Sequence, residues 1–174
     1  MSLTDIFKTK GDGKAAVQQK ATDLLKEDHK KVKGLLSQLE KTTERSAARR
    51  TKLLSQIEAE MKVHTTIEEE IFYPAYRDAV KKKDDRELYQ EALEEHHVVK
   101  LVLPEIKGTD PGSEVFGAKA KVLKELIEHH AGEEEEEMFH KARRALGMAE
   151  LRDLGARMEE RKRALSGKGN SRRR

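Results

Sequence analysis

Two segments of the chain pair a histidine with a glutamate four residues later. The segments read HTTIEEE from His64 and HAGEEEE from His130, and the pairs are His64 with Glu68 and His130 with Glu134. Residues four apart on a helix project from one face, a turn apart, so each pair would present an imidazole nitrogen and a carboxylate oxygen to a common point. These ligand types suit iron, manganese or zinc.

Two further histidines lie in the middle of predicted apolar helix stripes. The residues of these stripes recur at spacings of four, three, four and three: Leu25, His29, Val32, Leu36 and Leu39 on one helix, and Ala92, His96, Val99, Leu103 and Ile106 on another. If all the stripes face one interior, it receives four histidines and two glutamates. Burying these groups unpaired is costly, so we predict a bound metal ion, or two ions bridged by the carboxylates.

Two histidine doublets leave the choice of ligand open. His96 is followed by His97, and His130 is preceded by His129, which has its own glutamate four residues later, Glu133. We choose His96 because it continues the apolar stripe of its helix, and His130 because apolar residues lie one and two turns below it. The unchosen histidines, His97 and His129, could donate hydrogen bonds to the metal ligands without binding the metal themselves. A single histidine on an apolar stripe, or a run of glutamates, is common in proteins that bind no metal. The prediction of a metal site depends on finding four such histidines together with two His-x-x-x-Glu pairs.

The helices that must position these residues predict an all-α protein. We expect an up-down-up-down antiparallel four-helix bundle with helices starting at about residue 22 and spanning about 47–80, 86–107 and 114–146, and a short extra C-terminal helix over 149–165. Pro74 is expected to kink or end the second helix, and Gly147 to end the fourth. The predicted inward residues of the second and fourth helices are Leu53, Ile57, Glu60, His64, Ile67 or Glu68, Ile71, Leu123, Ile127, His130 and Glu134.

Composition supports this architecture and divides the chain. Charged residues make up 40% of it and aromatic ones 4%, which suits long helices with a narrow buried stripe. We expect a flexible leader over 1–21, the bundle over 22–147, the C-terminal helix over 148–166 and a basic disordered tail over 167–174. From Arg161 onward there are seven basic residues and no acidic one; without them, 29 basic residues face 33 acidic ones. The net charge of +3 therefore comes from this end.

Several classes of protein are excluded or disfavoured by what the sequence lacks. It contains no cysteine, which excludes disulfides, thiolate catalysis and sulfur-ligated zinc. It has no apolar run of membrane-spanning length and no signal-peptide pattern. We therefore expect a cytoplasmic protein without a membrane partner, either a monomer or a small homo-oligomer.

Four segments resemble hemerythrin-like proteins of the HHE cation-binding family. They are KEDHKKVKGLL around His29, HTTIEEEIFYPAY from His64, LEEHHVVK around His96 and HHAGEEEEEMF from His129, and the likeness covers about residues 22–146. The resemblance implies a non-haem iron site of two ions with an oxo or hydroxo bridge, with manganese or zinc as alternatives. It implies that Glu68 and Glu134 bridge the ions, and the implied ligands are His29, His64, Glu68, His96, His130 and Glu134.

The chain departs from the family pattern at two positions. Oxygen-carrying hemerythrins have another histidine where Lys100 follows His96 by four residues. This departure predicts an open coordination position, or a substitute such as tyrosine or water, and disfavours reversible O2 carriage relative to chemistry with peroxide or NO. A proline that is common in the fourth-helix motif is replaced by His140. We expect His140 to lie at the surface; the alternatives are that it hydrogen-bonds to a ligand or binds the metal itself.

The leading functional prediction is a metal protein that binds, senses or detoxifies O2, peroxide or NO. A peroxidase-like or catalase-like di-iron enzyme is one alternative, and whether the protein is an enzyme stays open because no catalytic residue stands out beyond the ligands. Iron storage or delivery is another alternative. A metal-free helical protein whose tail contacts nucleic acid ranks last, because the tail lacks interleaved aromatic residues.

Overall fold

The structure is a computed structural model that describes residues 19–167. Most of the predicted leader and tail, residues 1–18 and 168–174, lie outside the described residues. Every regular element within 19–167 is helical. In chain order the elements are α1 (Ala21–Glu40), the 3₁₀ turn η1 (Glu44–Ser46), α2 (Ala47–Ile67), the π turn η2 (Glu68–Phe72), α3 (Tyr73–Ala79), α4 (Lys83–Lys107), α5 (Glu114–Glu133), the π turn η3 (Glu134–Met138) and α6 (Phe139–Gly167).

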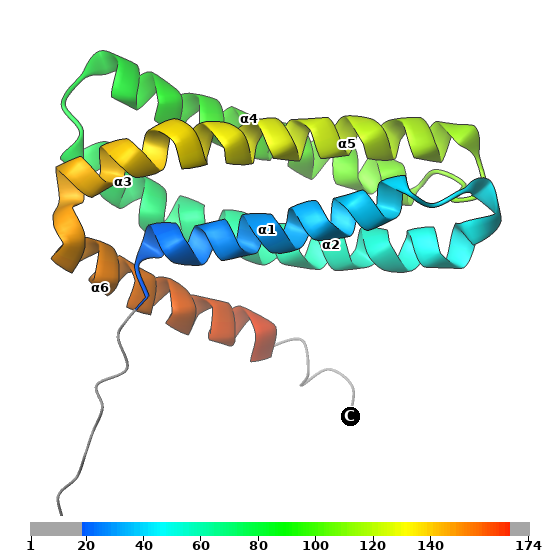
Figure 1. Ribbon diagram of the computed structural model, residues 1–174, viewed down its shortest axis with the longest axis horizontal. Helices are drawn as coiled ribbons and strands as arrows, with labels where there is room; N and C mark the ends of the chain where they lie inside the picture. Colours follow the sequence, from blue (N-terminus) through cyan, green and yellow to red (C-terminus); the bar gives the residue numbers. More distant parts are fainter. Residues whose placement is uncertain (1–18, 168–174) are drawn as a thin grey trace, which may run out of the picture.

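Four long helices pack around a common interior. α1 contacts α2 and α5, and α4 contacts the same two helices from the other side, so they form a ring in the order α1, α2, α4, α5 (Figure 1). The apolar stripes predicted for α1 and α4, including His29 and His96, are buried. Within residues 19–167, no helix has the length and apolar character needed to cross a bilayer.

The buried side chains form two apolar clusters, one toward each end of the bundle. The first joins the beginning of α1 to α3 and α6 and contains Leu25, Phe72 and Phe139. The second fills the other end and contains Val32, Ile57, Leu123 and Ile127, among others. On α1 the change from one cluster to the other falls between Leu25 and Val32. The interior at the level of His29 is therefore polar, with apolar packing above and below it.

The second and fourth predicted helices are each interrupted, which the sequence did not predict in full. Both breaks are π turns, and each begins at the glutamate of a His-x-x-x-Glu pair, Glu68 in η2 and Glu134 in η3. Pro74 cannot donate the amide hydrogen of a regular helix, but this explains at most the first break, because His140 occupies the matching place after η3. The feature common to both turns is the glutamate, and π turns often occur at functional sites.

Two other predictions need correction. α4 begins at Lys83 rather than near residue 86, and Asp84 and Asp85 in its first turn carry the negative charge that a helix start favours. Glu60 was predicted to face inward, but it is only partly buried and pairs with Lys31 at 2.7 Å. The neighbouring Met61 is buried in its place, because an apolar side chain fills the core without needing a partner.

α6 bends sharply at Gly147, and its second half turns back along the bundle. Gly147 has φ 76° and ψ 174°, a left-handed conformation that glycine adopts without steric cost. We call residues 148–167 the C-terminal arm. Leu151, Leu154 and Met158 are fully buried on its inner face, and α6 contacts both α1 and α2. Figure 1 shows the arm turning at the end of the bundle and running beside α1.

The packing of the arm against the start of α1 can be tested at Gly155, where the two backbones lie close together. A Cβ atom at Gly155 would overlap the carbonyl oxygen of Gln19 and lie 2.9 Å from the amide nitrogen of Ala21. Because both are backbone atoms, we expect Gly155→Ala to lower the free energy of unfolding by about 1–3 kcal/mol, measured by urea denaturation. Gly34→Ala is the matched control: no atom lies within 4 Å of its Cβ position, so this change should stabilise α1 by up to about 1 kcal/mol. Equal effects of the two substitutions would contradict the close approach.

Candidate metal centre

All six residues predicted as ligands meet in the polar layer between the two apolar clusters. His29 comes from α1, His64 from the end of α2, His96 from α4 and His130 from the end of α5, and each π turn contributes its first glutamate. Their side chains are at most 3% exposed. The tertiary structure therefore brings these six side chains together in one buried site, although His29 and Glu134 are far apart in the sequence.

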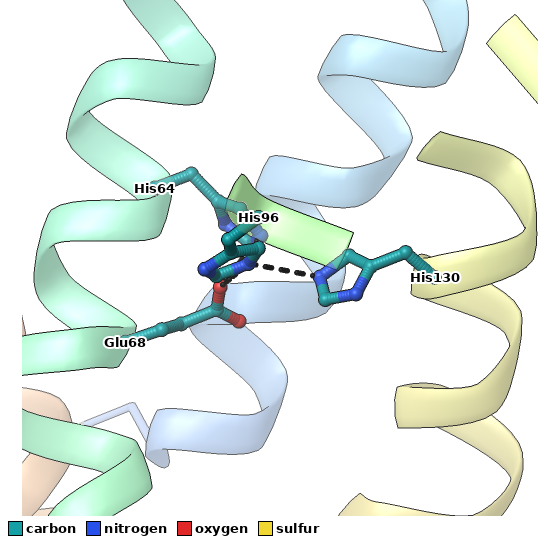
Figure 2. A group of neighbouring side chains, drawn as sticks. All are labelled: His64, Glu68, His96 and His130. Atoms are coloured by element: carbon teal, nitrogen blue, oxygen red, sulfur yellow. Dashed lines mark hydrogen bonds and ion pairs between the residues drawn. The ribbon is translucent and has the colours of Figure 1, made fainter. Parts of the chain in front are cut away.

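The ligand atoms form two overlapping groups of metal-binding size. One group contains His64, Glu68, His96 and His130, and the other contains His29, His64, Glu68 and Glu134; within each group the atoms all lie within 4.8 Å of one another. Figure 2 shows the three imidazoles of the first group pointing toward one another and toward Glu68. Because His64 and Glu68 belong to both groups, the arrangement is one continuous site.

Each histidine directs its Nε2 atom into the site. The Nε2 atoms of His96 and His130 are 3.1 Å apart. Glu68 Oε2 lies 3.1 Å from Nε2 of His64 and 3.3 Å from Nε2 of His96. Glu134 Oε2 lies 3.1 Å from Nε2 of His29 and 3.6 Å from Nε2 of His130. Each glutamate thus places one oxygen near two imidazoles, so that nitrogen and oxygen donors converge on the same space.

Each histidine also directs its Nδ1 atom outward, toward a carboxylate from a neighbouring helix. We call these residues the outer carboxylates. The Nδ1-to-oxygen distances are 3.8 Å for His64 with Asp28, 2.8 Å for His96 with Glu69, 2.7 Å for His130 with Glu95 and 3.0 Å for His29 with Glu135. An ionised carboxylate can only accept a hydrogen bond, so the short contacts of His96 and His130 favour the tautomer with a proton on Nδ1 and a free Nε2.

The outer carboxylates follow a simple rule along the chain. Each lies next in sequence to a predicted ligand of its own helix but contacts the histidine of the next helix around the bundle. Asp28 precedes His29, Glu69 follows Glu68, Glu95 precedes His96 and Glu135 follows Glu134. Because one residue along a helix turns the side chain by about 100°, the neighbour of an inward ligand points sideways, toward the adjacent helix. The four contacts form a closed ring of links through α1, α2, α4 and α5.

The sequence analysis did not predict the outer carboxylates. It expected only that the unchosen histidines could donate hydrogen bonds to the ligands. The signal for them is the acidic residue beside a ligand, as in EDH around His29 and EEH around His96. That signal is weak because such residues also occur on exposed helix faces. Only the packing of the neighbouring helix decides which acidic side chain meets an imidazole.

Burial and neighbouring charges divide the histidines into two kinds. Burial lowers the pKa of His64 to about 4, so this imidazole is neutral at pH 7 and free to bind a metal ion. Burial also opposes the charged form of His29, but its contacts with Glu134 and Glu135 raise the pKa to about 9. In the metal-free protein His29 therefore carries a proton at pH 7 and balances part of the negative charge of the glutamates.

The surroundings shift the pKa values of the two inner glutamates, Glu68 and Glu134, in opposite directions. Burial and the nearby charge of Glu134 hold the pKa of Glu68 well above its ordinary value. Burial also opposes ionisation of Glu134, but His130, His29 and His64 together lower its pKa. Two buried carboxylates at this separation resist being ionised together unless positive charge lies between them.

Several buried polar atoms of the site have no hydrogen-bond partner among the described residues. They include Nε2 of His29 and of His64, both carboxylate oxygens of Glu68, and Oε2 of Glu134. All belong to predicted ligands and come from two overlapping groups of metal-ligating side chains. Buried polar groups are rarely left without partners, and nitrogen and oxygen donors in this mixture fit iron, manganese or zinc. The residues present therefore fit the predicted metal.

Tyr73 adds a buried phenol hydroxyl to the site. Its hydroxyl donates to Glu134 Oε1 at 2.8 Å and lies 3.3 Å from Nε2 of His96. Burial, together with the charges of Glu134 and Glu68, raises the pKa of this phenol well above its ordinary value. Lys100 instead points out of the site, with its ammonium 2.6 Å and 2.8 Å from the two oxygens of Glu69.

The alternative histidines of the two doublets lie outside the site. His97 is exposed, and His129 is 61% exposed. His129 belongs to an outer group with Glu133 and Glu95, whose ligand atoms lie within 4.8 Å of one another. Glu95 therefore directs one oxygen to His130 and the other to this exposed group. His140 is also exposed, as the sequence led us to expect.

Comparison with known proteins agrees with the fold. A hemerythrin HHE cation-binding domain-containing protein from Mycobacterium kansasii has a crystal structure similar to this chain, with a TM-score of 0.74, 28% identity, and coverage of 86% of this chain and 89% of that one. A DNA nickase from Nostoc sp. (strain PCC 7120) is 28% identical over 117 residues, which are 67% of this chain and 32% of that protein. The chain thus spans about a third of the length of this relative.

The match to a family model covers most of the chain. The model describes the hemerythrin HHE cation-binding domain and matches residues 20–142. This segment contains all six predicted ligands, all four outer carboxylates and Tyr73. From the match and from the helical bundle with its buried histidine and glutamate side chains, we conclude that the chain belongs to the hemerythrin HHE cation-binding domain family.

Proposed function

We propose that the chain is a non-haem metal protein that holds two iron ions and binds, senses or detoxifies O2, peroxide or NO. The observation that carries the proposal is the set of buried, inward-facing donor atoms without hydrogen-bond partners, on His29, His64, Glu68 and Glu134. A site built only for structural stability would leave few such atoms. Two overlapping donor groups that share His64 and Glu68 support two neighbouring ions rather than one.

In this proposal the ligands are His29, His64, Glu68, His96, His130 and Glu134, with Glu68 and Glu134 bridging the ions. The metal pair would supply an open coordination position and redox chemistry for a small molecule. The chain's own contribution is to orient the imidazoles through the outer carboxylates and to exclude bulk water with the two apolar clusters. Tyr73, which donates to Glu134, is suited to hold a proton beside this ligand.

The histidine doublets provide a sharp test of this ligand set. We expect protein reconstituted anaerobically with Fe²⁺ to bind two ions per chain, measured by elemental analysis after desalting. His96→Ala or His130→Ala should weaken binding by more than the roughly 10–100-fold that loss of an outer partner costs, because each removes a donor atom.

His97→Ala and His129→Ala are the matched controls, since each removes an exposed histidine next to a proposed ligand. Both should retain two ions per chain. Loss of iron in His129→Ala together with retention in His130→Ala would show that the outer pair is the true ligand pair. A wild-type protein that folds but binds no stoichiometric metal would overturn the proposal.

Metal-free and iron-loaded protein should respond in opposite ways to rising pH. The pKa of His29 is raised from 6.5 to about 9 in the metal-free fold, so this group stabilises the fold below pH 6.5 and loses that effect as pH rises through 9. Metal binding needs the neutral imidazole and releases its proton, so it strengthens over the same range. The pKa of His64 is lowered from 6.5 to about 4, so His64 contributes a slope of opposite sign that fades above pH 6.5, and the slope from His29 is clearest near pH 8 to 9.

The measurement is the urea midpoint between pH 6.5 and pH 9, with chelator and with iron. We expect the stability of the metal-free protein to fall, by about 1.4 kcal/mol for each unit by which the pKa of His29 is raised. His29→Gln removes the titrating group and should flatten that slope. An equal slope in the wild type and in His29→Gln would contradict the proposed charge state of His29.

A further inference from the structure

We propose that Lys162, on the C-terminal arm, is a positioning residue for the metal site: its ion pair with Asp28 holds the outer carboxylate that orients His64. The inference rests on the proposed function and extends it to a part of the chain beyond residues 20–142, which match the family model. It follows from a comparison of the four outer carboxylates and the cations beside them.

Two outer carboxylates receive a lysine from the same helix as the histidine that they contact. Glu135 is 3.0 Å from Nδ1 of His29 and 3.2 Å from Nζ of Lys33. Glu69 is 2.8 Å from Nδ1 of His96 and 2.6 Å from Nζ of Lys100. In both cases the lysine follows the histidine by four residues, so one helix face presents the imidazole and the cation to the same carboxylate.

His64 and His130 cannot use this arrangement. The position four residues after each is occupied by a predicted ligand, Glu68 or Glu134, which must point inward. A cation for their outer carboxylates has to come from elsewhere in the fold. Glu95, beside His130, has no lysine or arginine within ion-pair distance among residues 19–167. Asp28, beside His64, is supplied by Lys162, which follows it by 134 residues in the chain.

The contact between Asp28 and His64 is the one that most needs support. Its distance of 3.8 Å is longer than a hydrogen bond, whereas the other three outer contacts measure 2.7–3.0 Å. Oδ2 of Asp28 and Nδ1 of His64 both lack hydrogen-bond partners among the described residues. His64 is therefore the least firmly oriented of the four imidazoles, and the direction of the Asp28 carboxylate depends on its other oxygen, which accepts from Lys162.

The arm can hold Lys162 in place because it is anchored independently of Asp28. The adjacent Arg161 makes a two-point contact with Glu70, at 2.7 Å and 2.9 Å, and Leu154 and Met158 are fully buried beneath the arm. Asp28 is 8% exposed. Removing the cation would leave a nearly buried carboxylate without its ion-pair partner, which is strongly unfavourable, so the Asp28 side chain would turn toward water and away from His64.

The first measurement is the affinity of the full chain for Fe²⁺, from anaerobic competition with a chromogenic chelator. Lys162→Met keeps much of the side-chain length and removes the charge, and we expect it to weaken binding about tenfold, at the lower end of the range for loss of an outer partner. Lys162→Arg should restore binding, because residue 162 lines a cavity of about 510 Å³ that has room for the longer side chain. Arg163→Met, at the exposed neighbouring position, should bind as the wild type does.

Two more variants separate the ion pair from other effects of the arm. If Lys162 acts through Asp28, Asp28→Asn should weaken binding at least as much, and adding Lys162→Met to it should cause no further loss. Additive losses would overturn the proposal. Arg161→Met removes a different anchor of the arm and leaves the Asp28 pair intact. A loss in Arg161→Met equal to that in Lys162→Met would assign the effect to docking of the arm and overturn the role of Lys162.

The second measurement is made on metal-free protein, so that it does not depend on the proposed function. Two-bond ¹H–¹⁵N spectra report the environment of each imidazole, with the His64 signals assigned through His64→Gln. We expect Lys162→Met to shift the His64 nitrogens and to leave those of His130 unchanged, and Arg163→Met to shift neither. Unchanged His64 signals in Lys162→Met would overturn the proposal. A wild-type protein that binds no iron would overturn the proposed function, while these spectra would still decide the positioning role.

Discussion

The ring of contacts between imidazoles and outer carboxylates is the interaction on which the site depends. Each link joins two neighbouring helices, and the four links close around the bundle through Asp28, Glu69, Glu95 and Glu135. A metal ligand is useful only if its free nitrogen points at the ion, and a hydrogen bond to the other nitrogen sets both tautomer and direction. The same contacts also set the distance between helices, so bundle packing and ligand geometry are coupled.

The charged layer is tolerated because the rest of the interior compensates for it. Six buried ionisable side chains lie between two apolar clusters that cover the site from both ends of the bundle. Within the layer, His29 is protonated in the metal-free protein and lies beside the inner glutamates. Before metal binding, the positive charge that balances the inner glutamates is thus on His29, which is itself one of the proposed ligands. Metal binding would replace the proton of His29.

Departures from regular helix geometry occur where the site requires them. Both π turns start at an inner glutamate, and the next residue of each turn, Glu69 or Glu135, contacts the histidine of the next helix. Gly147 performs a similar task on a larger scale, since its left-handed backbone turns the C-terminal arm back along α1. That reversal brings Lys162 to Asp28 and makes the end of the chain part of the surroundings of the site.

The sequence by itself determined the helical class, the inward stripes and the candidate ligands, because these follow from periodicity within one helix. A histidine on an apolar stripe, such as His29 or His96, must face the same way as its neighbours on that stripe. Tertiary structure alone decided the outer carboxylates, the place of Tyr73 and the role of Lys162, because these depend on which side chains of different helices meet. Adjacent residues such as Asp28 and His29 look equally polar in the sequence, and only the packing of α2 and the arm gives them different partners.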